Sequence, residues 1–170
     1  VLMLSKPLGT GLALAAGTPE QQAAAIAGMR TLNRVASETL QAMGGVVHAV
    51  TDVTGYGLAG HGWEMAERSG VRVVIETSGL VTYPGALEAA NEGKRTGGDP
   101  RNRDYLVGHL DSTAPAGPEA ICFDPQTSGG LLAAVAPGAA DQLLAAGWWQ
   151  AGVVEAGDAA SVLALVVRET

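Results

Sequence analysis

Asp52 is the residue of this sequence that is best placed to hold a metal ion. It follows a short β-branched apolar run, residues 46–50, which predicts a strand, and it lies in a glycine-rich corner, residues 51–57. Residues 58–68 then carry the apolar spacing of a helix. Backbone N–H groups at the start of a helix, together with the positive end of its dipole, favour anions. A carboxylate beside that helix start could hold a hard cation such as Mg²⁺, and the cation could hold phosphate.

The same stretch supports a second hypothesis. Gly55, Gly57 and Gly60 spell the G-x-G-x-x-G pattern, and Glu76 ends the next apolar run, as in a dinucleotide-binding unit. Against this, a four-residue polar step separates the strand from the first glycine, whereas the dinucleotide pattern opens almost directly from its strand. A third interpretation is structural, with the glycines needed for close packing and Asp52 acting as a helix cap.

Two further segments could contact phosphate. Lys6 lies in KPLGTG, which is not a P-loop because a P-loop needs four residues between its first glycine and its Gly-Lys pair. Thr127, Ser128 and Gly129 belong to DPQTSGG, a cluster of small residues before a predicted strand, where backbone donors can meet an anion. Each segment also has a structural explanation, namely a turn with a solvated lysine and a tight loop that satisfies its own backbone.

Three other features have both a functional and a structural explanation. Residues 94–103, KRTGGDPRNR, hold four of the ten basic residues and predict a mobile loop, either solvated or a basic flap over an anionic ligand. Cys122 lies in an apolar run and is expected to be an inert packed thiol, not a nucleophile. The adjacent Trp148 and Trp149 either form an exposed anchor for a partner protein or place one ring in the core and one at the surface.

Composition restricts the class of protein. The 170 residues are 47% apolar but only 4% aromatic, which predicts one domain with a core of Ala, Val and Leu. Ten basic and 17 acidic residues give a net charge of −7, which argues against nucleic acid or an anionic membrane as the main partner. No apolar run approaches the roughly 20 residues that span a bilayer, and no signal peptide is visible. The single cysteine fits a reducing cytosol, so we expect a cytoplasmic protein.

The order of the predicted elements indicates the fold class. We expect strands over 1–4, 46–50, 71–77, 131–135, 148–155 and 162–167, and helices over 18–43, 58–68, 84–91 and 137–146, with 105–118 irregular. The first helix carries a capping-box signal at Thr18 and Gln21 and is expected to bend near 28–33. Because the last two strands are joined by a turn at 157–158 without a helix, we predict an α+β fold, a mixed β-sheet covered by helices, with residues 1–170 as a single domain.

Four segments come in the order seen in one enzyme family. They are KPLGTG at 6–11, TDVTGYGLAGH at 51–61, GGDPRN at 97–102 and DPQTSGGLL at 124–132. Together they resemble the carboxy-terminal domain of selenophosphate synthetases (selenide, water dikinases), which belong to the aminoimidazole ribonucleotide synthetase-like superfamily. The resemblance covers nearly all of the chain. Because the sequence opens at Val1 with a strand-like run, we expect it to be one domain of a longer two-domain enzyme.

The resemblance implies an activity, a metal and partners. The family makes selenophosphate from selenide, water and ATP and releases AMP and orthophosphate, while Mg²⁺ bridges the nucleotide phosphates to carboxylates. Asp52 matches the metal-binding Asp of the TDVTG segment. Most other metal ligands, the reactive Cys or selenocysteine and its neighbouring Lys lie in an amino-terminal domain that dimerises. We therefore expect no catalytic residue in this chain, and no turnover by the chain alone.

The sequence departs from the family at two motif positions and leaves other functions open. Tyr56 replaces the usual Phe and keeps the ring, whereas Asp99 replaces the usual Thr of GGT-x-x-N and puts any phosphate contact there in doubt. One alternative is another member of the superfamily, such as thiamine-monophosphate kinase or a hydrogenase-maturation protein. Others are a nicotinamide-dinucleotide-binding module and a protein-interaction domain.

Overall fold

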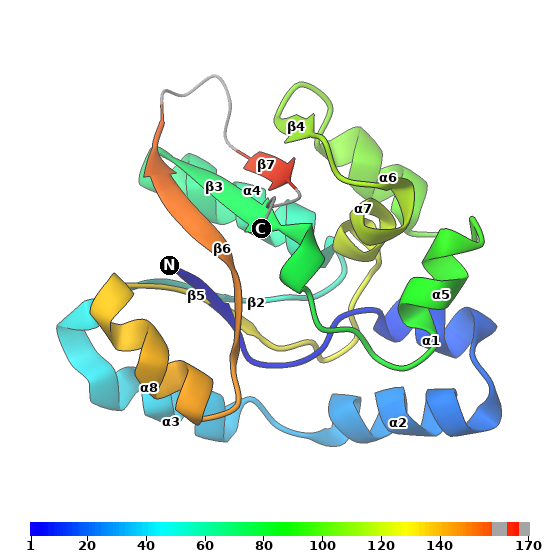
Figure 1. Ribbon diagram of the computed structural model, residues 1–170, viewed down its shortest axis with the longest axis horizontal. Coiled ribbons are helices and arrows are strands. Elements are labelled where there is room, and N and C mark those ends of the chain that lie inside the picture. Colours follow the sequence, from blue (N-terminus) through cyan, green and yellow to red (C-terminus); the bar gives the residue numbers. More distant parts are fainter. Residues whose placement is uncertain (158–162, 167–170) are drawn as a thin grey trace.

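The computed structural model describes residues 1–157 and 163–166, in which one β-sheet is covered by helices (Figure 1). The strands are β1 (Leu2–Leu4), β2 (Val47–Asp52), β3 (Val71–Glu76), β4 (Leu110–Ser112), β5 (Leu131–Val135), β6 (Trp149–Ala156) and β7 (Leu163–Val166). The α-helices are α1 (Thr10–Ala16), α2 (Pro19–Arg30), α3 (Arg34–Met43), α4 (Gly57–Ser69), α5 (Ala86–Asn91), α6 (Asp99–Tyr105), α7 (Ala116–Phe123) and α8 (Ala140–Ala145). Short 3₁₀ turns are η1 (Gly44–Val46), η2 (Thr77–Gly79) and η3 (Pro137–Ala139).

The sheet is mixed, as the sequence predicted. Its strand order is β2-β5-β1-β6-β3-β7-β4. The pairs from β2 to β3 are antiparallel, whereas β3–β7 and β7–β4 are parallel. This arrangement confirms the α+β fold class.

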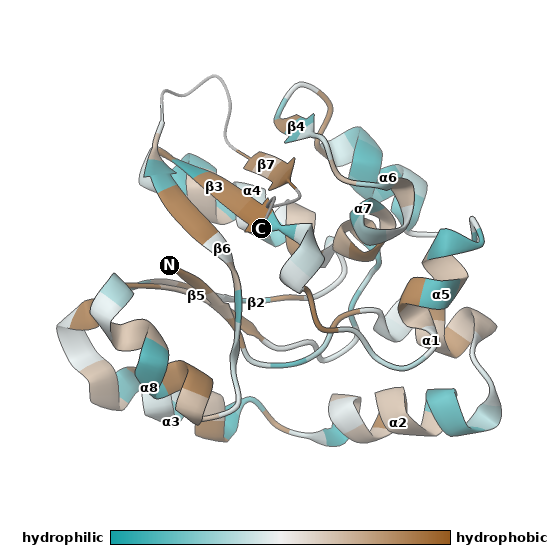
Figure 2. Cartoon of the chain, in the orientation of Figure 1, coloured by the Kyte–Doolittle hydropathy of each residue, from teal (hydrophilic) through white to brown (hydrophobic). Residues whose placement is uncertain are grey.

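Strand β5 divides the interior into two apolar clusters because both of its faces are buried. Leu132 and Ala134 belong to the larger cluster, which also contains buried residues of α1, α4, α5 and α7. Leu131, Ala133 and Val135 belong to the smaller one, which contains residues of α3 and α8. Figure 2 shows the hydrophobic strand β7, the hydrophobic middle parts of β3 and β6, and the mainly hydrophilic α6. A short strand buried on both faces explains why residues 131–135 form an unbroken apolar run.

The predicted break in the first long helix is confirmed. Helix α2 ends at Arg30 and α3 begins at Arg34. At the start of α2, the Thr18 hydroxyl accepts from the Gln21 N–H, and the Gln21 side chain accepts from the Thr18 N–H, so the capping box is formed. In the described part of the chain, none of the helices combines the length and apolar character needed to cross a bilayer.

Several predicted boundaries were wrong. The strand predicted over 46–50 runs over Val47–Asp52, so Asp52 is its last residue. Helix α1 was missed because its Gly-Thr-Gly start resembles a turn. The segment 94–103, predicted as a mobile loop, contains the start of α6, and the irregular 105–118 contains β4 and the start of α7. The predicted turn at 157–158 lies partly outside the described residues.

Candidate functional site

Asp52 is exposed at the end of β2, where it pairs in register with Leu131 of β5. Its carboxylate has no hydrogen-bond or ion-pair partner within residues 1–157 and 163–166. It is not a helix cap: α4 follows Tyr56, and the start of this helix has no side-chain cap among the described residues. The structural interpretation of Asp52 as a cap is therefore wrong, and the carboxylate is free to meet a ligand.

The loop between β2 and α4 is held by the segment after α7. The Val53 N–H donates to the Gly130 carbonyl at 2.8 Å, and the Gln126 N–H donates to the Thr54 carbonyl at 2.9 Å. Gly57 has a φ of +71°, and a Cβ there would lie 2.6 Å from the Cys122 carbonyl oxygen. The close approach and the backbone conformation both require glycine at this position.

The KPLGTG and DPQTSGG segments meet and satisfy one another. Asp124 Oδ2 accepts from the N–H groups of Gly11 and Leu12 at 2.9 and 3.2 Å. Gln126 Oε1 accepts from the N–H groups of Gly9 and Thr10 at 3.0 and 3.2 Å. These four donors lie at the start of α1, so that helix end is capped by the protein itself.

Asp124 is a buried carboxyl group whose surroundings shift its pKa. The side chain is 1% exposed. Desolvation raises the pKa of its carboxyl group to about 6, although the N–H donors of Leu12 and Gly11 act in the opposite direction. Asp124 is thus a buried cap whose charge depends on pH near neutrality.

Lys6 joins three segments. Lys6 is only 7% exposed. Its Nζ donates to the carbonyl oxygen of Thr31 and to that of Ser128, the latter at 2.9 Å. Thr31 is the C-cap of α2, where a cation is favoured by the helix dipole. Desolvation lowers the pKa of Lys6. Two of its three N–H bonds are therefore used inside the protein, and its contact with phosphate stays a prediction.

The three other expected phosphate contacts differ in exposure. Thr127 and Ser128 are exposed, and Ser128 has a φ of +49°, in the left-handed region. The Thr127 N–H already donates to Thr10 Oγ1 at 3.0 Å. Gly129 is buried, and a Cβ there would overlap the Val53 carbonyl oxygen. Gly129 therefore serves close packing, while the Thr127 and Ser128 side chains stay available as candidates.

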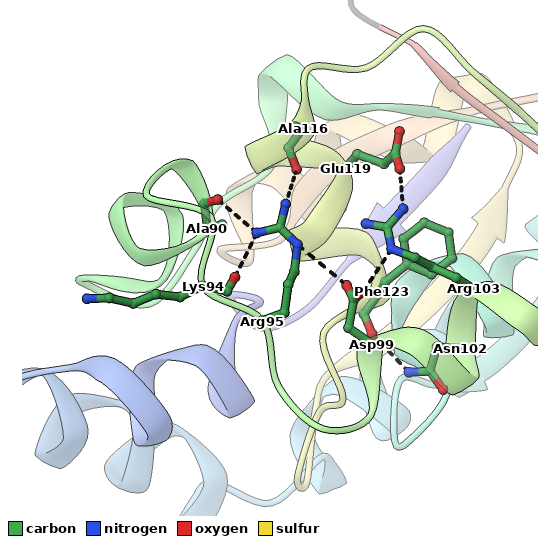
Figure 3. A network of polar contacts seen from close by, with 9 residues as sticks. All are labelled: Ala90, Lys94, Arg95, Asp99, Asn102, Arg103, Ala116, Glu119 and Phe123. Atoms are coloured by element: carbon green, nitrogen blue, oxygen red, sulfur yellow. Dashed lines mark hydrogen bonds and ion pairs between the residues drawn. The ribbon is translucent and has the colours of Figure 1, made fainter.

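The basic segment 94–103 is not a free flap. Figure 3 shows Arg95 and Arg103 converging on the buried Asp99. Arg103 Nε donates to Asp99 Oδ1 at 2.8 Å, and Arg103 Nη1 donates to Glu119 Oε1. The Arg103 guanidinium carbon lies 4.3 Å from the centroid of the Phe123 ring. Arg95 also donates to three backbone carbonyls. Of the two interpretations, a solvated loop or a basic flap, neither describes Arg95 and Arg103, because Asp99 of the same segment and Glu119 of α7 are their counter-ions.

Asp99 has a structural role where the resembling family has Thr. Burial by itself lowers the pKa of Arg103, but hydrogen bonds and charge from Asp99 and Glu119 hold it above its usual value. The pKa of Glu119 is held below its usual range, because Arg103 and Ser112 outweigh the effect of burial. Asp99 thus serves as an internal counter-ion that fixes α6.

Sequence reasoning missed a polar and aromatic cluster at the start of α4. His61 Nε2 lies 3.0 Å from Thr54 Oγ1, and its Nδ1 lies 3.1 Å from Glu64 Oε2. The Tyr105 hydroxyl donates to the other oxygen of Glu64, and the Tyr105 ring stacks on Tyr56 at 4.7 Å. The spacing of Thr54, His61 and Glu64 was the available signal, but Tyr105 comes from α6, far along the chain.

Two smaller expectations are settled by burial. Cys122 is buried, and desolvation raises the pKa of its thiol, so it is the inert packed residue that was predicted. Trp148 is buried and Trp149 is half-buried. The two rings therefore do not form a joint exposed anchor.

The topology argues against a dinucleotide-binding unit. Strands β2 and β3 flank the glycine pattern, but three other strands lie between them in the sheet. In a dinucleotide-binding βαβ unit the two strands joined by the helix lie side by side as a parallel pair, whereas β2 pairs with β5 and β3 pairs with β6 and β7. Gly60 instead gives room to Tyr56, whose Cβ would lie 2.6 Å from an added methyl group.

Comparison with known proteins decides the family. Residues 1–164 match the family described as "AIR synthase related protein, C-terminal domain". The chain belongs to this family. Among curated relatives, a selenide, water dikinase of Trichlorobacter lovleyi is 41% identical over 146 residues, which are 82% of this chain and 41% of that protein. One of Pelobacter propionicus is 43% identical over 152 residues, covering 85% and 43%. The chain thus spans less than half the length of these relatives.

Solved structures share the fold of this AIR synthase related domain. Thiamine monophosphate kinase from Aquifex aeolicus aligns with a TM-score of 0.63 at 17% identity, covering 99% of this chain and 50% of that one. A hydrogenase maturation protein HypE in complex with ATP aligns with a TM-score of 0.55 at 17% identity, covering 91% and 42%. At these identities the likeness concerns the fold alone.

Asp52 of this AIR synthase related domain fits Mg²⁺ as a single ligand. It is exposed and unpaired in the described structure, and a carboxylate oxygen is a hard ligand that suits the ion. The described residues contain no group of three His, Cys, Asp or Glu side chains arranged to hold a metal. Any Mg²⁺ held here would need further ligands from a nucleotide or from another protein segment.

Proposed function

We propose that this chain is the carboxy-terminal domain of an ATP-dependent selenide, water dikinase. The enzyme converts selenide, ATP and water into selenophosphate, AMP and orthophosphate. The observation that carries the proposal is the 40–43% identity to selenide, water dikinases over more than four-fifths of the chain. Thiamine monophosphate kinase and HypE structures match at only 16–23%, which supports a shared fold but favours the selenium enzyme over either of them.

In the proposed reaction, Asp52 supplies one carboxylate ligand to Mg²⁺. An ion held there would supply charge neutralisation at the nucleotide phosphates, which is a main requirement of phosphoryl transfer. The chain's own contribution is to present this carboxylate on a fixed strand end, with Thr127 and Ser128 exposed on a neighbouring loop. The polar groups that hold these loops, Asp124 and Gln126, are buried and act on structure, not on substrate.

The remaining parts of the site would come from outside this chain. We assign the nucleophile, its lysine and the other metal carboxylates to an amino-terminal domain, and we expect the full-length enzyme to be a cytoplasmic homodimer. The chain spans less than half of its curated relatives, which leaves room for such a domain. The buried, unreactive Cys122 supports placing the nucleophile elsewhere.

The proposal is tested on the full-length protein that carries this chain. Purified enzyme with ATP and Mg²⁺ is given either selenide or thiamine monophosphate, and AMP, orthophosphate and ADP are quantified. Selenide-dependent AMP and orthophosphate in equal amounts are expected. ADP formation that depends on thiamine monophosphate, or no response to selenide, would contradict the proposal.

A further inference from the structure

Asn102 is a buried amide that ties together two of the segments described above. The residue is 5% exposed, and its Nδ2 donates to the carbonyl oxygens of Gly55 and Phe123, each at 2.9 Å. Gly55 lies in the loop that follows Asp52, and Phe123 immediately precedes Asp124. One side chain therefore links the loop after β2 to the last residue of α7.

The Asn102 amide is itself held in place. Helix α6 carries it between Asp99 and Arg103, which pair with one another at 2.8 Å, and the Asn102 N–H donates to the Gly98 carbonyl at 3.0 Å. Arg103 in turn reaches Glu119 of α7, and Figure 3 shows Asn102 beside this ion-pair network. The charged network thus fixes the helix that presents the amide.

Gly55 depends on this hydrogen bond more than its neighbours do. Val53 and Thr54 are held by main-chain hydrogen bonds to Gly130 and Gln126. These bonds involve backbone atoms alone, so they do not depend on which side chains the four residues carry. Gly55 is exposed, and a Cβ added there would meet no described atom within 4 Å. The Gly57 N–H donates to the Thr54 carbonyl at 3.0 Å and closes a turn around Gly55, and within the described residues the Asn102 amide is the side-chain group that holds the Gly55 carbonyl itself.

We propose that Asn102 is a positioning residue for the metal-binding carboxylate, an inference that rests on the proposed function of Asp52. By holding the Gly55 carbonyl, it keeps the loop from Val53 to Gly57 in one conformation. That loop fixes the direction in which β2 ends and α4 begins, and hence the direction of the Asp52 side chain. Asn102 acts through the backbone and touches neither metal nor nucleotide.

The first test uses the present chain without metal. In Asn102→Ala, amide hydrogen exchange of Val53 and Gly57 is expected to speed up about tenfold, the usual effect of losing one net hydrogen bond. The matched control is Gln22→Ala, since the Gln22 amide also donates to two carbonyls, those of Leu14 and Gly17. The control should leave exchange in the loop unchanged. Unchanged loop exchange in Asn102→Ala would overturn the proposal.

The second test uses the full-length enzyme. In Asn102→Ala, the Mg²⁺ concentration for half-maximal rate should rise about tenfold, and Mn²⁺ binding in the presence of ATP should weaken by a similar factor. Asn102→Ser keeps one hydrogen-bond donor, so its metal affinity should lie between those of wild type and Asn102→Ala. This milder variant is the one to use if Asn102→Ala does not fold. If both variants only lower the melting temperature while metal affinity stays at the wild-type value, the role is structural and the proposal is wrong. Wild-type enzyme without selenide-dependent AMP would instead overturn the proposed function itself, and this inference with it.

Discussion

At the scale of single residues, exposure separates the groups that can meet a ligand from those that hold the site. Asp52 is exposed and unpaired in the described structure, whereas Asn102, Asp124 and Gln126 are buried and hydrogen-bonded. A buried polar group without partners would be costly, so each of these three has donors or acceptors supplied by another segment. The exposed carboxylate that we propose as a metal ligand is thus supported by buried amides and a buried carboxyl group.

The direct test of Asp52 is its replacement in the full-length enzyme. In Asp52→Asn, selenide-dependent AMP formation should fall at least about 100-fold, because an amide is a poorer Mg²⁺ ligand than a carboxylate. The free energy of unfolding should change by no more than about 0.5 kcal/mol, since the side chain is exposed. Asp111→Asn is the control, because Asp111 is a surface carboxylate that pairs with Arg72 at 3.3 Å. Near-normal activity of Asp52→Asn at ordinary Mg²⁺ concentration would rule out Asp52 as a ligand.

Asp124 predicts a specific pH dependence of stability. Burial raises its pKa from 3.8 to about 6, so the folded state binds this proton more tightly than the unfolded state. Its contribution is fully present below the unfolded pKa and is lost as the pH rises through about 6. The free energy of unfolding of wild type minus that of Asp124→Asn should therefore increase by about 1 kcal/mol from pH 7 to pH 5. Urea denaturation at the two pH values measures this, and parallel profiles for the two proteins would contradict it.

The sequence placed Asp52 near a strand end because that signal is local, while its role as a metal ligand stays a prediction. Asp52 lies at the end of an apolar run beside glycines, and the structure leaves it exposed at a strand end. The roles of Asn102 and Gln126 were not predictable in this way, because their acceptors and donors lie 21 to 117 positions away in the sequence. A single sequence carries no signal for which distant carbonyl an amide will reach.

At the scale of elements, the start of α1 explains why glycine-rich segments were misinterpreted. Gly9 has a φ of +93°, and Gly11 leaves room for the Asp124 carboxylate. These are turn-like residues, yet Gln126 and Asp124 supply the caps that let a short helix begin there. Local propensity indicated a loop, and long-range capping overrode it. Helix α6 differs, because its Gly-Gly-Asp-Pro start also predicted a loop but the stabilising pair of Asp99 and Arg103 is local, at i,i+4 within the helix.

Contact between the loop after β2 and the segment before β5 can be tested at Gly129. Gly129→Ala places a methyl group against the Val53 carbonyl oxygen, which is backbone and cannot move aside cheaply. The free energy of unfolding should fall by about 1–3 kcal/mol, as for other overpacking changes. Gly138→Ala is the control, because a Cβ there meets no described atom within 4 Å. Equal unfolding midpoints for the two variants in chemical denaturation would contradict this packing.

At the scale of the whole molecule, two of the four family-like segments, KPLGTG and TDVTGYGLAGH, hydrogen-bond to a third, DPQTSGGLL, and the fourth, GGDPRN, reaches Gly55 and the end of α7 through Asn102. KPLGTG is capped by Asp124 and Gln126, and TDVTG bonds to Gln126 and Gly130. Sequence order alone placed these segments in a family but could not show that they share one hydrogen-bond network. The network supports the strand end that carries Asp52, as the proposed role of this domain in completing a metal site requires.

This arrangement predicts that the chain alone folds but does not turn over. All the described strands belong to one sheet, and two apolar clusters pack on it. The chain should therefore unfold in a single cooperative transition. Yet the described residues offer no cluster of three metal ligands, and one carboxylate does not hold Mg²⁺ tightly. With selenide, ATP and Mg²⁺, the isolated chain should therefore form no AMP above background, while the full-length enzyme does. Circular dichroism melting establishes that the chain is folded in the same assay buffer. Robust AMP formation by the folded chain would mean that the reacting groups lie within these 170 residues, against the placement of the nucleophile and the other metal ligands in a second domain.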